Sequence, residues 1–231
     1  METEVSHEAE EYLEAIYRLQ KRRGIARTTE LASELNVVPG SVTNTIQHLK
    51  KRGLVKHKPY RGVTLTAKGE KIALNILRRH RLAERLLTDV LNAEWSNVHE
   101  DACKLEHALT REVVTLLERK LGYPKFCPHG NPIPSENGKV EEEECHPLTE
   151  ANINEAFIVA RITNEKREKL QILASKEIKP GIAVRVVERT SFGMVLYVAG
   201  RKYTLDYDVA SSVLVKNMEG IMNARHKKAV T

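Results

Sequence analysis

The chain has 231 residues, of which 41% are hydrophobic and 29% charged, as expected for one large or two to three small globular domains. No apolar run is long enough to span a bilayer, and the acidic N-terminus is unlike a secretion signal, so we expect a cytoplasmic protein without a membrane partner. The three cysteines, an odd and low number, argue against a disulfide framework and favour metal binding.

Positive charge is concentrated in the first third of the chain. Between Arg18 and Lys71 there are 13 Lys or Arg residues and three Glu residues, whereas the whole chain has a net charge of +6. Such a segment indicates a phosphate-binding surface, although a solvated basic face has the same composition.

The same segment has the pattern of a winged helix-turn-helix. Helices are predicted over 7–23, 30–35 and 39–52. Strands over 54–57 and 63–66 flank a basic turn, which is the pattern of a wing. We expect double-stranded DNA as the partner, with bases contacted from the third helix by Ser41, Thr43, Asn44 and Gln47 and phosphates held by Lys51, Lys58 and Arg61. Helix capping or simple exposure explains Ser41 and Thr43 equally well.

The remainder of the chain predicts a helical block and a small β domain. A long helix over 67–92 has more apolar surface than the DNA-binding unit can cover. Together with further helices over 97–109 and 110–121 it predicts a dimerisation domain. Residues 122–150 are rich in Pro, Gly and Glu and predict a linker. Short strands are expected over 156–162, 183–188, 194–198, 201–205 and 212–215, as in a small barrel.

The predicted fold class is therefore mainly α with a small all-β domain. The expected division is a winged helix-turn-helix domain over 1–72, a metal-binding and dimerisation domain over 73–122, a linker over 123–152 and an SH3-like domain over 153–231.

Ligand-type side chains occur where the helical block should be apolar. His80 and Glu84 are four residues apart, and the next helix has four more at offsets that place them on one stripe, His99, Cys103, Glu106 and His107. Imidazole, thiolate and carboxylate together suit Fe²⁺, Mn²⁺, Co²⁺, Ni²⁺ or Zn²⁺. Each residue alone has an ordinary structural explanation, but six at these offsets favour a metal site.

Four stretches resemble the diphtheria toxin repressor family of iron- and manganese-dependent regulators. They are residues 11–17 (EYLEAIY), 79–87 (RHRLAERLL), 98–107 (VHEDACKLEH) and 130–134 (GNPIP). The resemblance is specific from residue 8 to about residue 135 and looser beyond. It implies a repressor that binds a palindromic operator as a homodimer when loaded with metal, and not an enzyme.

The resemblance also implies two metal sites in each subunit. His80, Glu84 and His99 correspond to an ancillary site, and Glu11, Cys103, Glu106 and His107 to a primary site. The iron branch of the family has a methionine at position 11. The manganese branch has an aspartate there and a glutamate matching Glu14, but lacks Cys103. We expect Fe²⁺, with Mn²⁺ as the alternative, and binding of Co²⁺, Ni²⁺ and Zn²⁺ in vitro. In three-domain members the C-terminal domain supplies further ligands, for which Glu165 and Glu168 are candidates here.

Two rival functions fit the winged helix or the ligands. A winged-helix regulator that senses no metal leaves the six ligand-type residues unexplained. A metalloenzyme needs an open coordination position and a substrate cleft, for which the sequence has no signature. Separately, Cys127, His129, Cys145 and His146 match the ligand set of a closed zinc site, although these residues are also typical of a turn.

Overall fold

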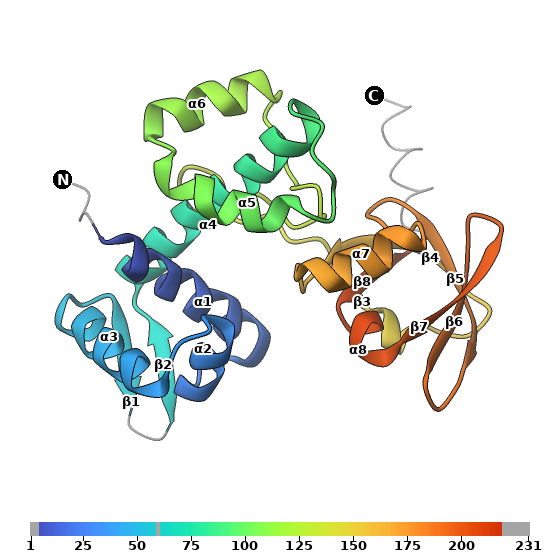
Figure 1. The fold of residues 1–231 in the computed structure, drawn as a ribbon, viewed down its shortest axis with the longest axis horizontal. Helices are drawn as coiled ribbons and strands as arrows, with labels where there is room; N and C mark the ends of the chain where they lie inside the picture. Colours follow the sequence, from blue (N-terminus) through green and yellow to red (C-terminus); the bar gives the residue numbers. More distant parts are fainter. Residues whose placement is uncertain (1–4, 59–60, 219–231) are drawn as a thin grey trace. The chain divides into compact units, whose positions relative to one another are not determined.

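The computed structural model describes residues 5–58 and 61–218 (Figure 1). These residues form two compact units. The first comprises the described residues up to His80 together with residues 106–109 and 134–140. The second comprises residues 81–105, 110–133 and 141–218. The long helix α4 (Ala67–Asp89) contributes residues to both units.

The first unit is the predicted winged helix-turn-helix. Its elements, in chain order, are α1 (His7–Arg23), α2 (Thr28–Glu34), α3 (Pro39–Lys51), β1 (Val55–Lys58), β2 (Gly62–Leu65) and the first part of α4. β1 and β2 pair antiparallel from Val55 opposite Leu65 to Lys58 opposite Gly62. The tip of this wing, residues 59 and 60, lies outside the described part of the chain.

Local chemistry sets the ends of the helices in the first unit. The Ser6 hydroxyl accepts a hydrogen bond from the Ala9 amide at 3.3 Å and caps α1. Gly24 ends that helix with a φ of 77°, a left-handed conformation that glycine adopts without strain. Pro39 begins α3, where its missing N–H is not needed. Leu13, Ile46 and other apolar side chains of all three helices then pack into one buried core.

The second unit combines a helical block with an antiparallel sheet. Its helices are the last part of α4, α5 (Val98–Leu105), α6 (Arg111–Lys120), α7 (Arg167–Ser175) and the short α8 (Tyr207–Ala210), with a 3-10 turn η2 (Leu148–Glu150). Its six strands lie in the order β3-β8-β4-β5-β6-β7. They are β3 (His146–Pro147), β4 (Ala156–Ile162), β5 (Ala183–Arg189), β6 (Gly193–Val198), β7 (Arg201–Asp206) and β8 (Val213–Asn217). The mainly α fold with a C-terminal β domain is thus confirmed.

Three sequence-based expectations differ from the structure. The helix expected over 97–109 stops at Leu105, and Glu106–Ala108 form a 3-10 turn, η1, so the predicted ligand stripe does not continue on one helical face. The stretch expected to be a linker ends in a strand, β3, that pairs with β8. The sequence analysis also missed α7, because two residues, Leu170 and Leu173, provide its buried face.

The first turn of α4 approaches the backbone at Leu54 so closely that position 69 has no room for a side chain. The Thr66 hydroxyl accepts from the Gly69 amide at 3.1 Å, and the Thr66 amide donates to the Leu54 carbonyl at 3.0 Å. A Cβ placed on Gly69 would lie 2.0 Å from that same carbonyl oxygen. Helix α4 therefore begins in direct backbone contact with Leu54, the residue before β1.

We expect Gly69→Ala to lower the midpoint of urea denaturation, since relieving such a clash costs on the order of 2 kcal/mol. Gly40→Ala, in α3, is the matched control, because a Cβ there meets nothing within 4 Å. Removing a helical glycine stabilises by about 0.5–1 kcal/mol, so the control midpoint should rise. Equal midpoints for the two variants would contradict the close approach.

Candidate metal centres and DNA-binding surface

The predicted reading helix presents one polar face to solvent. Val42, Ile46 and Leu49 on α3 are fully buried in the core of the first unit. The opposite face exposes the predicted base-contacting residues, which are Ser41, Thr43, Asn44 and Gln47, and the predicted phosphate-binding Lys51. Lys58 and Arg61, on either side of the wing tip, are also exposed. The Thr43 hydroxyl donates to the Pro39 carbonyl at 3.1 Å, so the helix backbone already uses that hydrogen.

A cluster of carboxylates and imidazoles is buried in the first unit. Nδ1 of His80, on α4, lies 2.6 Å from Oε2 of Glu106, and both side chains are at least 98% buried. The other carboxylate oxygen of Glu106 lies 3.5 Å from Nε2 of His107. Burial raises the pKa of Glu106, and the hydrogen bond from His80 opposes that rise. Three of the predicted metal ligands therefore meet here.

Glu10, next to the predicted ligand Glu11, contacts this cluster from α1. Glu11 is exposed. Its neighbour Glu10 contacts Nδ1 of His107 at 2.7 Å and Nη2 of Arg79 at 2.6 Å. Glu14, one turn later, is buried and forms a 2.6 Å ion pair with Arg18. Consecutive residues point about 100° apart on a helix, so one position decides which carboxylate meets the imidazole.

A second buried cluster lies in the second unit. Glu84, on α4, is fully buried, and its Oε1 lies 3.1 Å from Nδ1 of His129 and 3.4 Å from Nδ1 of His99. Glu165, between β4 and α7, contacts the same two nitrogens at 3.4 and 3.5 Å. Two carboxylates and two imidazoles therefore share one site.

A thiol completes that site. Cys127 is buried, and its sulfur belongs with Glu84, His129 and Glu165 to a group whose ligand atoms all lie within 4.8 Å of one another. Burial raises the pKa of the Cys127 thiol, and the charge of Glu84 adds to the rise. This group is hereafter called the Cys127 cluster. Carboxylate, imidazole and thiol side chains that converge in this way fit a divalent transition metal.

Neighbouring groups orient the ligands of the Cys127 cluster. Nε2 of His129 lies 3.0 Å from the Trp95 carbonyl, which directs Nδ1 toward the two carboxylates. The Asn131 amide donates to Glu165 at 2.8 Å and to the Ile162 carbonyl at 2.8 Å. Burial by itself disfavours the charged forms of His129 and Glu165. The contacts with Glu84 and Glu165 nevertheless raise the pKa of His129 well above its usual value. The His129 hydrogen bond in turn lowers the pKa of Glu165 to about 2.

A tight turn positions Cys127 and His129. The Cys127 amide donates to the Asn131 carbonyl at 2.9 Å, and the Gly130 amide donates to the Cys127 carbonyl at 2.9 Å. Gly130 has a φ of 84°, and a Cβ there would lie 2.2 Å from the Ala160 carbonyl oxygen on β4. Only glycine permits this approach, so the GNPIP stretch places the ligands against the β domain.

Three family models match successive parts of the chain. Residues 4–63 match the model of the iron-dependent repressor N-terminal DNA-binding domain, and residues 66–135 match that of the iron-dependent repressor metal-binding and dimerisation domain. Residues 146–217 match the FeoA domain. The diphtheria toxin repressor of Corynebacterium glutamicum is 30% identical over 91% of this chain and 96% of its own length. The chain belongs to the diphtheria toxin repressor family.

Other members of the family give the same result. The iron-dependent repressor IdeR of Mycobacterium tuberculosis is 28% identical over 90% of this chain and 96% of its own. A manganese-dependent transcriptional repressor in complex with manganese is similar, with a TM-score of 0.85, 30% identity and coverage of 91% of this chain and 100% of its own. The IdeR of T. acidophilum has a TM-score of 0.79 at 31% identity, with 93% and 99% covered. This chain thus belongs among metal-dependent transcriptional repressors.

The family resemblance pointed to only part of the Cys127 cluster. The Cys127 cluster contains Glu84 and the candidate Glu165, whereas the other C-terminal candidate, Glu168, is exposed on α7. Cys103 is also exposed, with its sulfur 4.0 Å from Nε2 of His99. The spacing Cys127-Pro128-His129 marked two members of this cluster, but it gave no indication that α4 and the segment between β4 and α7 supply the others.

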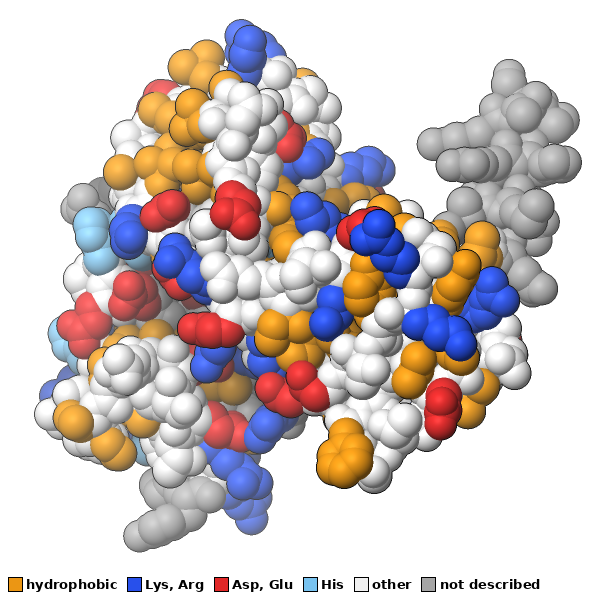
Figure 2. All heavy atoms as spheres, turned by 45° about the vertical axis from the view of Figure 1, so that its right-hand side comes forward, with side chains coloured by type: hydrophobic (Ala, Val, Ile, Leu, Met, Phe, Trp, Pro, Cys, Tyr) orange, Lys and Arg blue, Asp and Glu red, His pale blue; other side chains and the backbone are white. Residues whose placement is uncertain are grey.

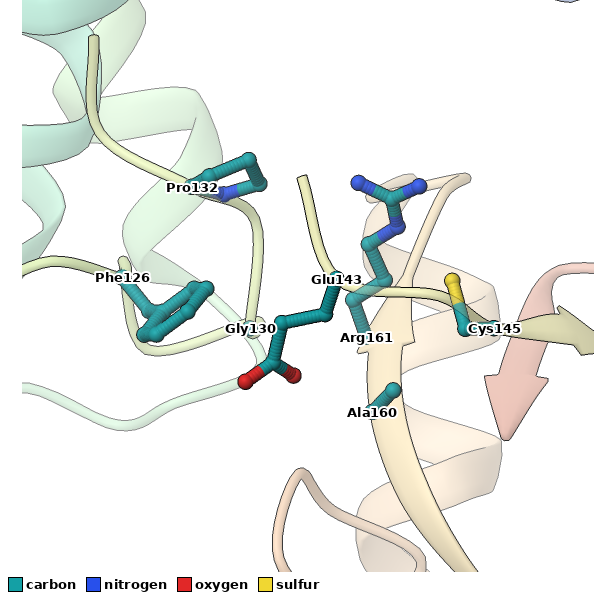
Figure 3. Close-up of a pocket in the computed structure, with 7 residues that line it drawn as sticks. All are labelled: Phe126, Gly130, Pro132, Glu143, Cys145, Ala160 and Arg161. Carbon is teal, nitrogen blue, oxygen red and sulfur yellow. The ribbon is translucent and has the colours of Figure 1, made fainter. Parts of the chain in front are cut away.

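The zinc set suggested by the second cysteine pair does not form. Neither Cys145 nor His146 belongs to any cluster of three or more ligand-type side chains among the described residues. Cys145 lines a small pocket with Phe126, Glu143 and Arg161 (Figure 3). The ring of His146, on β3, packs edge-on against Phe157 at 5.4 Å. His146 lies opposite Val215 in the pairing of β3 with β8.

Proposed function

We propose that this member of the family represses transcription by binding operator DNA when a divalent transition metal occupies its buried carboxylate–histidine clusters. The observation that carries the proposal is the orphaned ligand atom in the first unit. Nε2 of His107 is buried and has no hydrogen-bond partner among the described residues, although Glu106 lies 3.5 Å away. A buried ring nitrogen without a partner is costly, and an ion held with Glu106 satisfies it.

We propose two metal centres. The primary centre contains Glu106 and His107, with Glu11 and Cys103 as the further ligands that the family pattern implies. The second centre is the Cys127 cluster, together with His99 and with His80 from the family pattern. Two carboxylates and a thiol lie close together in this centre. A bound cation would supply the positive charge that stabilises their ionised forms, and the imidazoles would bind it as neutral ligands.

Fe²⁺ is the metal we propose, with Mn²⁺ as the alternative. Carboxylates favour hard cations, whereas the thiols of Cys103 and Cys127 favour Fe²⁺ and softer ions. Relatives bear on both, since curated members are named iron-dependent repressors and solved members include manganese-dependent ones. A further similar structure, ScaR, holds Cd²⁺ or Zn²⁺, which supports binding of softer metals in vitro as well.

We propose that the protein assembles as a homodimer through an apolar patch of the second unit. Between residues 90 and 123, five large hydrophobic side chains are more than 40% exposed, namely Val90, Leu91, Val113, Leu116 and Tyr123. Hydrophobic side chains gather around α6 in the space-filling view (Figure 2). An exposed apolar patch of this kind is typical of an interface, and a twofold dimer matches a palindromic operator. The proposed role is to bind DNA in the cytoplasm, without catalysis. No helix among the described residues could cross a membrane.

The first test is metal-dependent binding to operator DNA. Operator sequences are selected from a random pool with wild-type protein and Mn²⁺, and binding is followed by fluorescence anisotropy under anaerobic conditions with Fe²⁺ or Mn²⁺. We expect Glu106→Ala and His107→Ala to lose the metal-induced gain in affinity, by more than about 100-fold, because both remove ligands. Lys216→Ala, far along the chain on β8, is the control. Unchanged metal dependence in both ligand variants would sink the primary centre.

The second test separates base contacts from phosphate contacts. Asn44→Ala and Gln47→Ala should each lose about 1–3 kcal/mol of preference for the operator over random DNA. Lys58→Ala and Arg61→Ala should weaken both kinds of DNA alike and lower the slope of affinity against salt by about one ion each. If Asn44→Ala and Gln47→Ala keep the operator preference, α3 does not contact the bases.

The third test uses the single tryptophan as a reporter of the Cys127 cluster. Trp95 packs edge-on against the His129 ring at 4.9 Å, and its carbonyl contacts that ring. Zn²⁺ or Mn²⁺ should therefore change Trp95 fluorescence in wild type and in Cys145→Ser, and the change should be lost in Cys127→Ser and Glu165→Gln. Circular dichroism checks that these variants fold. Loss of the signal in Cys145→Ser alone would revive the zinc set and contradict the cluster.

A further inference from the structure

The imidazole of His107 is held on two sides within the first unit. Its Nδ1 lies 2.7 Å from a carboxylate oxygen of Glu10. The His7 ring stacks on it, with centroids 4.8 Å apart and planes inclined by 17°. One contact fixes the rotation of the ring and the other fixes its plane. Together the two contacts restrict where the opposite nitrogen, Nε2, can lie.

Glu10 is itself held by a cation. Its other carboxylate oxygen lies 2.6 Å from Nη2 of Arg79 on α4, and both side chains are more than four-fifths buried. This ion pair fixes the carboxylate between α1 and the first part of α4. It also offsets the negative charge of Glu10, so the carboxylate remains an acceptor for His107.

The same arrangement occurs at the neighbouring imidazole. Nδ1 of His80 contacts Oε2 of Glu106 at 2.6 Å, just as Nδ1 of His107 contacts Glu10. A carboxylate that accepts from Nδ1–H selects the tautomer whose lone pair is on Nε2. In His107 that nitrogen is the buried atom without a hydrogen-bond partner among the described residues, and it faces Glu106.

We propose that Glu10 is the positioning residue of the primary metal centre. It holds His107 in the Nδ1–H tautomer with Nε2 directed at Glu106, and Arg79 holds Glu10 in turn. This rests on the proposed function, since it assigns His107 to a metal. It separates two adjacent acids of α1, because Glu10 orients a ligand whereas Glu11 is the residue that the family pattern places as a ligand itself.

The tautomer is measured without metal, by ¹⁵N NMR of the histidine rings at a pH where they are neutral. The His107 signals are assigned by their absence from His107→Gln. We expect wild type and Glu8→Gln, the control on the exposed side of α1, to show the Nδ1–H form. Glu10→Ala should show a mixture, and Glu10→Gln, whose amide oxygen still accepts, should stay close to wild type.

Mn²⁺ affinity, measured by calorimetry, gives the second readout. We expect Glu10→Ala to weaken binding at the primary centre by about 10–100-fold, as is usual for outer partners of ligating histidines. Glu11→Gln should weaken binding without altering the metal-free tautomer. Wild-type tautomer or wild-type affinity in a folded Glu10→Ala would overturn the inference. Failure of wild type to bind Mn²⁺ overturns the proposed function instead, and leaves the tautomer result standing.

Discussion

The structure depends on carboxylates that are buried among imidazoles. Glu84 and Glu106 are almost completely withdrawn from water, a position that costs several kcal/mol for an uncompensated ion. Each is compensated by histidine nitrogens, Glu106 by His80 and His107 and Glu84 by His99 and His129. Removing any one partner leaves a buried charge or a buried donor unsatisfied. In each unit, therefore, the groups that make it a candidate for binding metal also compensate the charge of a buried carboxylate.

This constraint explains why the side chains of the candidate sites are held in defined orientations. The Trp95 carbonyl, the Asn131 amide and the Glu10 carboxylate each contact a candidate ligand and limit its orientation. Ligands held in this way lose little further conformational freedom on binding. The backbone contributes as well, because Gly130 allows the loop bearing Cys127 and His129 to lie directly on β4. Burial, tautomer and loop geometry thus act on the same few side chains.

Much of the fold could be predicted because its signals are local. Helical spacing, Gly24 and Pro39 mark α1 and α3, and the exposed face of α3 follows from which residues complete its apolar stripe. Apart from β3, which lies in the expected linker, the β strands were predicted to within about two residues from short apolar runs. The exceptions have local causes too. Helix α5 gives way to a 3-10 turn at Glu106, and α7 has too few apolar residues to be recognised by its spacing.

By itself, the sequence determined the winged helix, the helical block, the β domain and the types of ligand available, since each depends on residues close together in the chain. Only the tertiary structure decided which ligands meet. It brought Cys127 and His129 to Glu84 and Glu165, left Cys145 beside Arg161, and turned Glu10 rather than Glu11 toward His107. The physical reason is that the contacts among these ligand-type side chains join residues 36 to 97 positions apart, from His129–Glu165 to Glu10–His107, and one step along a helix redirects a side chain by about 100°. No periodicity in the chain encodes that choice.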